Sequence, residues 1–386
     1  MIAAKPAILS RPRLVPLDTS LLSAIARDKF SRLPEKRERA SIFASTLGDL
    51  GCVVLLCWHH VEELIAHNDP KVVADRLAFI RSLPLLAWVA SASGDEGLGS
   101  IVDILAVEVS AALLPNSGVV AVRDRAATKL IRFGSGEQAL RPYESYWGIL
   151  KEQTRERQEN IRDIVAISRS DYNDMSKTKL SELEKGILRS PVDRDRQFEL
   201  LSRRLAQDIQ HRGDERIKDP VASADRFFND VKSKALAIVP DGSNPVHLIM
   251  RAHGIEPSEM RPDATPEDVG NLAAFRRRLQ IVSQIVGASF EELKVRVRED
   301  QIPSCVIQGA INRYRQDTPE RKGSDLTDNY LACLSAYSDV IYVDKRTFEN
   351  IRRAEQKCPE LVALLRGVEK ASNYQMIAGQ LSAWRF

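Results

Sequence analysis

Two carboxylates stand directly after short apolar segments at opposite ends of this chain. Asp18 follows apolar residues 13–17, and Asp344 follows apolar residues 341–343. If both segments are parallel strands, their carboxyl ends meet at one edge of a sheet, and the two side chains are expected to lie together. Several unpaired anions repel one another, so such a cluster requires a cation, and a divalent metal ion is the best match.

Further carboxylates occupy comparable positions. Glu62 and Glu63 lie in a helical pattern that follows the apolar run 52–57, while Asp325 and Asp328 begin a second helical pattern. Two divalent ions about 4 Å apart can stabilise both the attacking and the leaving oxygen of a phosphodiester during hydrolysis. Carboxylates supply the oxygen ligands that such ions need. These residues therefore predict a metal-dependent hydrolase of phosphodiesters.

Strands and helices alternate around these acids. The apolar segments predict strands over 13–17, 52–57 and 85–90, and a further strand at 341–343. Helical spacing of apolar residues predicts helices between them, over about 19–26, 35–50, 58–67 and 70–82. Alternation of this kind is typical of an α/β protein with a parallel sheet.

The middle of the chain differs from both ends. From about residue 95 to 320 strand-like runs nearly vanish and helical periodicity dominates, with mixed charge typical of solvated helices. We therefore expect an α/β domain split in sequence, with its first half at 1–92 and its second at 322–386. A largely α-helical insertion at 93–321 would separate them.

The order of these motifs resembles the PIN-domain nuclease family. It runs from strand–Asp–Thr–Ser–helix to a helix with Glu-Leu, then to Asp-x-x-Leu-Ala opening a helix, and finally to strand–Asp–Lys–Arg. By this resemblance the four acids of the family correspond to Asp18, Glu63, Asp328 and Asp344. Glu62 is a near substitute for the second acid, and Asp325 is either an extra ligand or a helix cap.

The resemblance implies a PIN-like α/β/α sandwich around a parallel sheet, and a ribonuclease that depends on Mg²⁺ or Mn²⁺. It also suggests an endoribonuclease that acts as a bacterial toxin or an antiphage defence effector. Its partners would be RNA, a regulatory protein or antitoxin, and a second copy of the chain. Thr19 matches a hydroxyl position beside the first acid, and Lys345 and Arg346 beside Asp344 are candidate phosphate-binding residues. The large insertion departs from the family and leaves the substrate open.

Composition excludes several other classes. A net charge of +3 does not indicate binding to nucleic acid by bulk charge. The five cysteines form no CxxC pair, as expected for reduced thiols in a cytosolic protein. No apolar run approaches the roughly 20 residues that span a bilayer, so no membrane partner is expected. The chain has no GxxxxGK[ST] or GxSxG motif, which argues against nucleotide-binding and serine-hydrolase functions.

Each motif also has a structural interpretation. An acid after a strand is most often a helix cap. The spacing of His59, His60 and His67 is not that of a zinc site and favours a polar network. The run 276–278 of three arginines favours a solvated helix face, and the aromatic residues Tyr143, Tyr146 and Trp147 favour packing. Two alternatives to the ribonuclease remain: a non-catalytic PIN-like scaffold that binds protein or RNA through its helices, and a metal-dependent DNA nuclease.

Overall fold

The computed structural model describes residues 11–168, 170, 178–183, 191–238, 250–251, 254–261, 263–316 and 324–383. The chain forms two compact units, which are described separately. Unit 1 comprises Met1–Lys151, Asp300–Arg315 and Asp328–Phe386, and unit 2 comprises Glu152–Glu299 and Gln316–Thr327. Unit 1 holds the strands of the described residues, whereas unit 2 is built from helices.

A four-stranded sheet lies in the first part of unit 1. Its strands are β1 (Arg13–Val15), β2 (Cys52–Leu56), β3 (Leu86–Val89) and β4 (Ile131–Gly134), in that spatial order. The pairs β1–β2 and β2–β3 are parallel, while β3–β4 is antiparallel. The first three strands confirm the predictions from the apolar segments. The fourth was not predicted, because it is only four residues long and lies in the stretch from about 95 to 320 where helices were expected.

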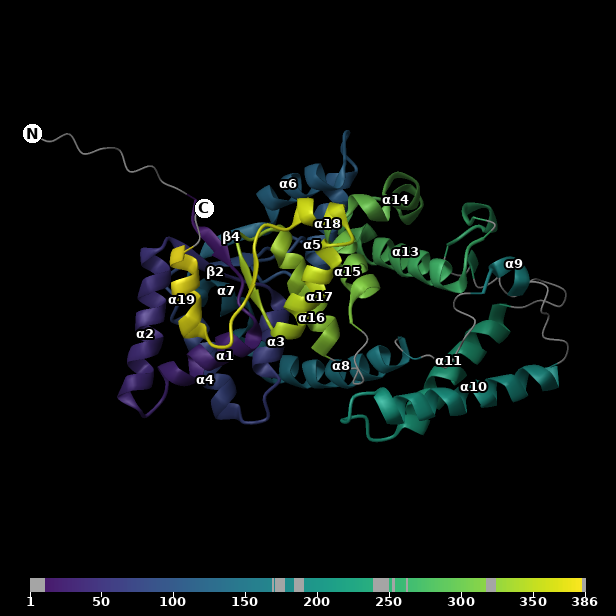
Figure 1. Ribbon diagram of the computed structural model, residues 1–386, viewed down its shortest axis with the longest axis horizontal. Coiled ribbons are helices and arrows are strands. Elements are labelled where there is room, and N and C mark those ends of the chain that lie inside the picture. The colour runs from purple at the N-terminus through teal and green to yellow at the C-terminus, as the bar shows by residue number, and fades with distance from the viewer. Residues whose placement is uncertain are drawn as a thin grey trace, which may run out of the picture. The chain divides into compact units, whose positions relative to one another are not determined.

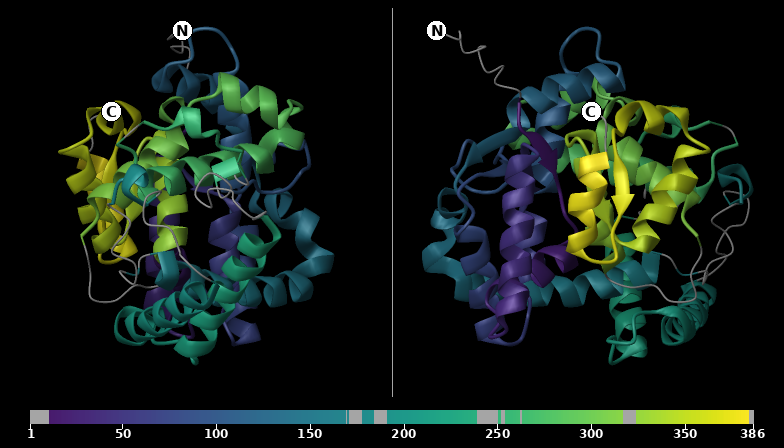
Figure 2. Two further views of the ribbon diagram at one scale, coloured as in Figure 1. Left: turned by 90° about the vertical axis from the view of Figure 1, so that its right-hand side faces the viewer. Right: turned by 60° about the vertical axis from the view of Figure 1, so that its left-hand side comes forward.

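The last part of the chain adds strands beside β1. A two-stranded parallel sheet is formed by β5 (Ile341–Val343) and β6 (Val368–Lys370). A parallel bridge joins Leu17 to Tyr342: the Tyr342 N–H donates to the Pro16 carbonyl at 3.0 Å, and the Asp18 N–H donates to the Tyr342 carbonyl at 2.8 Å. The C-terminal strands (yellow) thus lie against the first strand (purple), as Figure 2 shows in its right-hand view. Segments from the two ends of the chain share one sheet edge.

Helices connect the parallel strands of unit 1. Two helices follow β1, two follow β2, and two lie between β5 and β6. The first four agree in position with the four helices predicted before residue 83. Asp18, Asp69 and Asp344 each accept a backbone N–H at the start of the helix they precede, which is the usual role of an N-cap. The bounds are α1 (Thr19–Lys29), α2 (Pro34–Asp49), α3 (Trp58–Ile65), α4 (Pro70–Arg81), α16 (Ser324–Ala332), η5 (Cys333–Ala336), α17 (Lys345–Glu355), α18 (Pro359–Leu364) and α19 (Tyr374–Ala383).

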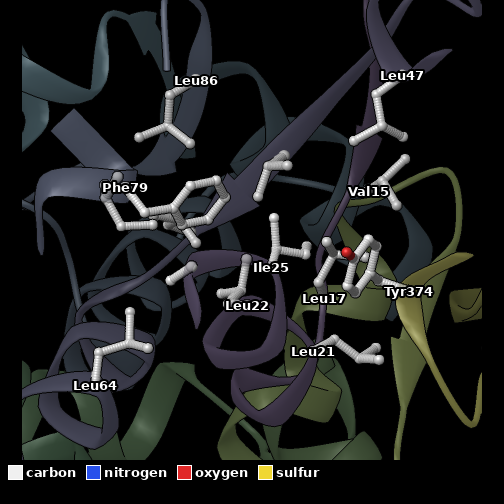
Figure 3. Close-up of a cluster of buried hydrophobic side chains, with 14 of the residues drawn as sticks. Val15, Leu17, Leu21, Leu22, Ile25, Leu47, Leu64, Phe79, Leu86 and Tyr374 are labelled. Atoms are coloured by element: carbon white, nitrogen blue, oxygen red, sulfur yellow. The ribbon is translucent and has the colours of Figure 1, made fainter. Parts of the chain in front are cut away.

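Helices cover both faces of the strands. Alternate strand residues point to opposite sides, so that Val15 and Val54 belong to one apolar cluster while Leu14 and Val53 belong to another. Figure 3 shows the first cluster, in which Leu21, Leu22 and Ile25 of α1 meet Val15, Phe79, Leu86 and Tyr374. On this side α19, from the end of the chain, lies beside α2 (Figure 1). The second cluster is completed by α15 (Pro303–Tyr314), η5, α17 and α18.

The unit around the strands is larger than the predicted halves 1–92 and 322–386. It continues to Lys151 and includes α5 (Ile101–Ala112), α6 (Val119–Leu130), α7 (Gly136–Leu140), η1 (Arg141–Tyr146) and the first residues of α8 (Trp147–Ser168). The buried carboxylate of Glu108 in α5 explains part of this. It accepts hydrogen bonds from Ser304 of α15 at 2.5 Å and from the Tyr337 hydroxyl at 2.6 Å. These bonds tie residues of the predicted insertion to the segment between α16 and β5.

Unit 2 consists of helices with small apolar clusters of their own. One cluster joins Leu205 and Ile209 to Phe228, and another contains Met250 and Ile255. The arginine run 276–278 was predicted to lie on a solvated face, which is wrong for Arg276: it is 7% exposed and pairs with Glu259 at 2.7 Å. The helices are α9 (Leu180–Leu183), α10 (Pro191–Arg212), α11 (Pro220–Ile238), η3 (Pro257–Glu259), α13 (Pro266–Val286), α14 (Phe290–Arg296) and η4 (Glu299–Gln301).

Candidate metal centre

Asp18 and Asp344 are brought together by adjacent strands. Each follows its strand and caps the next helix: Asp18 Oδ1 accepts the Ser20 N–H at 2.7 Å, and Asp344 Oδ1 accepts the Thr347 N–H at 2.6 Å. Because Leu17, just after β1, forms a parallel bridge with Tyr342 of β5, both carboxylates lie at the same strand edge. The charge of Asp344 reaches Asp18 and contributes to raising the pKa of Asp18, although burial has the larger effect.

Asp328 is the most perturbed member of the group. Burial raises the pKa of its carboxyl group, and the negative charges of Asp344, Glu63 and Asp18 raise it further, to about 8. Because Coulombic interactions weaken with distance, these effects place the other three carboxylates in the neighbourhood of Asp328. The four acids predicted from the sequence therefore meet in unit 1, although they come from four separate segments.

Glu63 and Glu62 point to different neighbours. Burial raises the pKa of Glu63, whose nearest charged neighbours include Asp18, and the Thr19 hydroxyl partly offsets that rise. The Glu62 carboxylate instead binds the His59 ring at 2.8 Å, from Oε2 to Nδ1. The sequence did not decide whether Glu62 or Glu63 is the second acid of the site. In the structure Glu63 acts on Asp328, whereas Glu62 is hydrogen-bonded to His59.

Thr19 places a buried hydroxyl beside this group. The residue is only 7% exposed, and within the described part of the chain its Oγ1 has no partner in hydrogen-bond geometry. It lies close enough to Glu63 to lower the pKa of that carboxyl, so the oxygen faces the acids without completing a bond to them. A buried hydroxyl of this kind is normally satisfied, so Thr19 is a candidate oxygen donor to a ligand near Glu63.

The two basic residues after Asp344, Lys345 and Arg346, have different environments. The Arg346 guanidinium contacts Asp328, with Nη2 to Oδ2 at 3.3 Å, and it lowers the pKa of Asp328 against the four effects that raise it. Lys345 is exposed at the first position of α17. Arg346 therefore already faces the acids, whereas Lys345 faces solvent beside them. Asp325 lies in α16, but its side chain is outside the described residues.

A hollow opens at this strand edge. Asp18, His60, Asp328 and Thr347 line it together with apolar residues, namely Leu17, Leu331, Ile341, Tyr342 and Val343. His60 was missed as part of the site, because a histidine one turn before Glu63 carries no spacing signal by itself. Among the described residues, no group of three or more His, Cys, Asp or Glu side chains is already arranged as metal ligands. The acids are near one another but do not form a closed ligand set.

Most of the other motifs singled out in the sequence have structural partners. His59 and His60 hold local contacts within unit 1, as expected for a polar network. Tyr143 packs between Trp58 and Trp147, with ring centroids 4.8 and 5.8 Å away, as expected for packing residues. The same prediction is wrong for Tyr146, which is 56% exposed. Burial raises the pKa of the Cys57 thiol to about 12, so this cysteine is not a nucleophile at neutral pH.

No family model, no curated protein and no solved structure matches this chain. Within the described residues, none of the helices has both the length and the apolar character that crossing a bilayer requires.

Proposed function

We propose that unit 1 is a PIN-like nuclease in which Asp18, Glu63, Asp328 and Asp344 hold one or two Mg²⁺ or Mn²⁺ ions. One observation carries the proposal: burial raises the pKa of Asp328, and the charges of Asp344, Glu63 and Asp18 raise it further, to about 8. Buried carboxylates that act on one another are costly in a folded protein. A divalent cation removes that cost, which is the physical reason to expect one at this strand edge.

The chemistry of the donors fits such an ion. The four carboxylates and the unpartnered hydroxyl of Thr19 are oxygen ligands, the kind that Mg²⁺ and Mn²⁺ prefer. The ion would lower the pKa of a water molecule and neutralise charge on the scissile phosphate. Asp18 and Asp344 each cap a helix through Oδ1, and Oδ2 would be the oxygen that each carboxylate offers to the cation.

Two changes in the protein must accompany cation binding. Asp328 must lose a proton that it holds at neutral pH, and Arg346 must move away from the Asp328 carboxylate. Once displaced, the guanidinium lies beside the site with donors suited to a phosphate oxygen. Arg346 would then bind substrate, with Lys345 adding positive charge from the first turn of α17.

RNA is the proposed substrate, and cleavage within the strand is the proposed reaction. Both follow from the resemblance to PIN-domain nucleases, so DNA is kept as the alternative substrate. The proposed biological role is that of a bacterial toxin or antiphage effector, whose activity a regulatory protein or antitoxin inhibits. Unit 2 would select the RNA, contact that regulator, or join two copies of the chain.

Incubation with total RNA and Mn²⁺, followed by sequencing of the cleaved ends, tests the activity. Wild type should produce new internal ends, and Asp18→Asn and Asp328→Asn should not. Asp49→Asn is the matched control, because Asp49 is an exposed acid of unit 1 at the end of α2. Single-stranded and duplex DNA are incubated in parallel to separate the two substrates. Equal cleavage by wild type and Asp328→Asn would mean that the assigned site is wrong.

A non-catalytic scaffold is the second candidate. The contact between Arg346 and Asp328 favours it, because a guanidinium can replace a metal as the counter-charge of an acidic cluster. Thermal unfolding with and without Mn²⁺ separates the two candidates. A rise in melting temperature that Asp328→Asn abolishes supports the metal centre, and an unchanged melting temperature supports the scaffold.

Expression in a bacterial host tests the proposed biology. Induction of wild type should arrest growth if the enzyme is a toxin, while induction of Asp328→Asn at the same protein level should not. If both proteins arrest growth, the arrest does not depend on RNA cleavage, and the proposal that the nuclease is a toxin is wrong.

A further inference from the structure

Two adjacent histidines begin helix α3, and neither belongs to the proposed ligand set. His59 is 8% exposed and His60 is 1% exposed. Both lie one turn before Glu63 on the same helix. Buried imidazoles are costly unless their nitrogens are paired, so their partners identify their role.

His60 connects α3 to the end of β1. Its Nδ1 accepts the Cys57 N–H at 3.0 Å, which leaves the ring proton on Nε2. On the other side the Leu17 carbonyl lies against the ring and partly offsets the effect of burial, which lowers the pKa of His60 to about 4. The uncharged ring thus fills the space between α3 and the residue that precedes Asp18, and it lines the same hollow as Asp18 and Asp328.

His59 connects α3 to two other helices. Its Nδ1 donates to Glu62 Oε2 at 2.8 Å, and its Nε2 accepts the N–H of Ile101, the first residue of α5, at 3.2 Å. Its ring also packs against Tyr330, with centroids 4.9 Å apart and an interplanar angle of 36°. Tyr330 is two residues after Asp328 on α16, so His59 contacts the helix that carries the most perturbed acid.

We propose that His59 and His60 are positioning residues of the metal centre: His60 fixes Asp18, and His59 fixes Asp328, relative to Glu63. This inference rests on the proposed function. Neither ring can serve as a ligand as it stands, because Nδ1 and Nε2 of His59 both have partners, and those of His60 face Cys57 and Leu17. Their rigid contacts hold mutually repelling acids close together before the cation arrives.

The effect should appear in metal affinity. Replacing a residue that positions a metal ligand usually lowers metal affinity about 10- to 100-fold. His59→Leu and His60→Leu keep side chains of similar bulk but remove the ring nitrogens. Each should therefore weaken Mn²⁺ binding about tenfold or more. A purely structural role would lower the melting temperature and leave the affinity of the folded protein unchanged.

Calorimetric titration of the full chain with Mn²⁺ tests this, at a temperature where circular dichroism shows each variant to be folded. His67→Gln is the matched control: His67 is exposed just beyond α3, its Nδ1 accepts the Asp69 N–H, and its replacement should leave affinity unchanged. His60→Gln restores an N–H donor opposite Leu17 and should bind Mn²⁺ more tightly than His60→Leu. If either leucine variant fails to fold, Tyr330→Leu removes the ring contact from the partly exposed side and should also weaken binding.

The outcomes distinguish the two proposals. Weaker binding in the histidine variants, with His67→Gln unchanged, supports the inference. Wild-type affinity in folded His59→Leu and His60→Leu, or in Tyr330→Leu where those do not fold, overturns the inference and leaves the metal centre standing. Absence of Mn²⁺ binding by wild type overturns the metal centre and the inference with it.

Discussion

Replacement of Asp328 by asparagine should stabilise the metal-free protein, and more so as pH rises. In the folded protein the pKa of this carboxyl is raised from the ordinary 3.8 to about 8, by burial first and then by Asp344, Glu63 and Asp18. Between these two values the folded state binds a proton that the unfolded state releases. The free energy of unfolding therefore falls as pH rises from about 4 to about 8. Asparagine has the same shape and no such proton, so the variant lacks this pH dependence.

The magnitude follows from the two pKa values. Each pH unit between them contributes ~1.4 kcal/mol, so holding Asp328 in the fold costs roughly 2 kcal/mol at pH 5 and roughly 4 kcal/mol at pH 7. The side chain is 14% exposed, so solvent screening reduces this only in part. We expect the stability advantage of Asp328→Asn over wild type to grow by about 1 to 3 kcal/mol between pH 5 and pH 7.

Urea denaturation at both pH values, in the presence of EDTA, measures this difference. Tryptophan fluorescence is a suitable signal because Trp58, Trp88 and Trp147 all lie in unit 1. Asp49→Asn, at an exposed position, should change stability by less than about 0.5 kcal/mol and equally at both pH values. If the advantage of Asp328→Asn is the same at pH 5 and pH 7, then Asp328 is not a buried acid among other acids and the assembled site is wrong.

Three further changes test separate parts of the structure. Glu63→Gln should abolish Mn²⁺-dependent cleavage, while Glu62→Gln, which keeps an oxygen for the His59 N–H, should retain measurable cleavage; the reverse order would exchange their roles. Arg346→Gln removes the cation that competes for Asp328, so Mn²⁺ should bind at least as tightly while KM for RNA rises; looser Mn²⁺ binding with an unchanged KM would contradict this. Glu108→Leu leaves the donors of Ser304 and Tyr337 unsatisfied in the core and should lower the free energy of unfolding by about 3 kcal/mol in urea titrations, against little change for exposed Glu144→Leu.

Local sequence was sufficient for the elements that frame the site. The run 52–57 is apolar throughout and became the fully buried strand β2. The helices after Asp18 and Asp69 begin where an acid can accept a free N–H, which short-range chemistry dictates. The antiparallel strand β4 escaped prediction because it is short and partly exposed, and because its pairing with β3 depends on a neighbour more than 40 residues away.

Two features of unit 1 could not be predicted from the local sequence pattern. One step along an α-helix turns the side chain by about 100°, so the neighbours Glu62 and Glu63 cannot face the same group. The sequence could not choose between them, because the choice depends on where His59 and Thr19 lie in space. The boundary of unit 1 could not be predicted either, because α5 is joined to the rest of the unit by hydrogen bonds to residues about 200 positions later in the chain.

By itself the sequence determined the identity of the acids, their order, and their places at the ends of strands and the starts of helices. These follow from local hydrophobicity and capping, which act over a few residues. Only the tertiary structure decided that the charges of Asp344, Glu63 and Asp18 reach Asp328, whose pKa burial and these charges raise to about 8. Desolvation and charge repulsion arise between segments that meet only when Leu17 and Tyr342 are brought together, so no local pattern contains them.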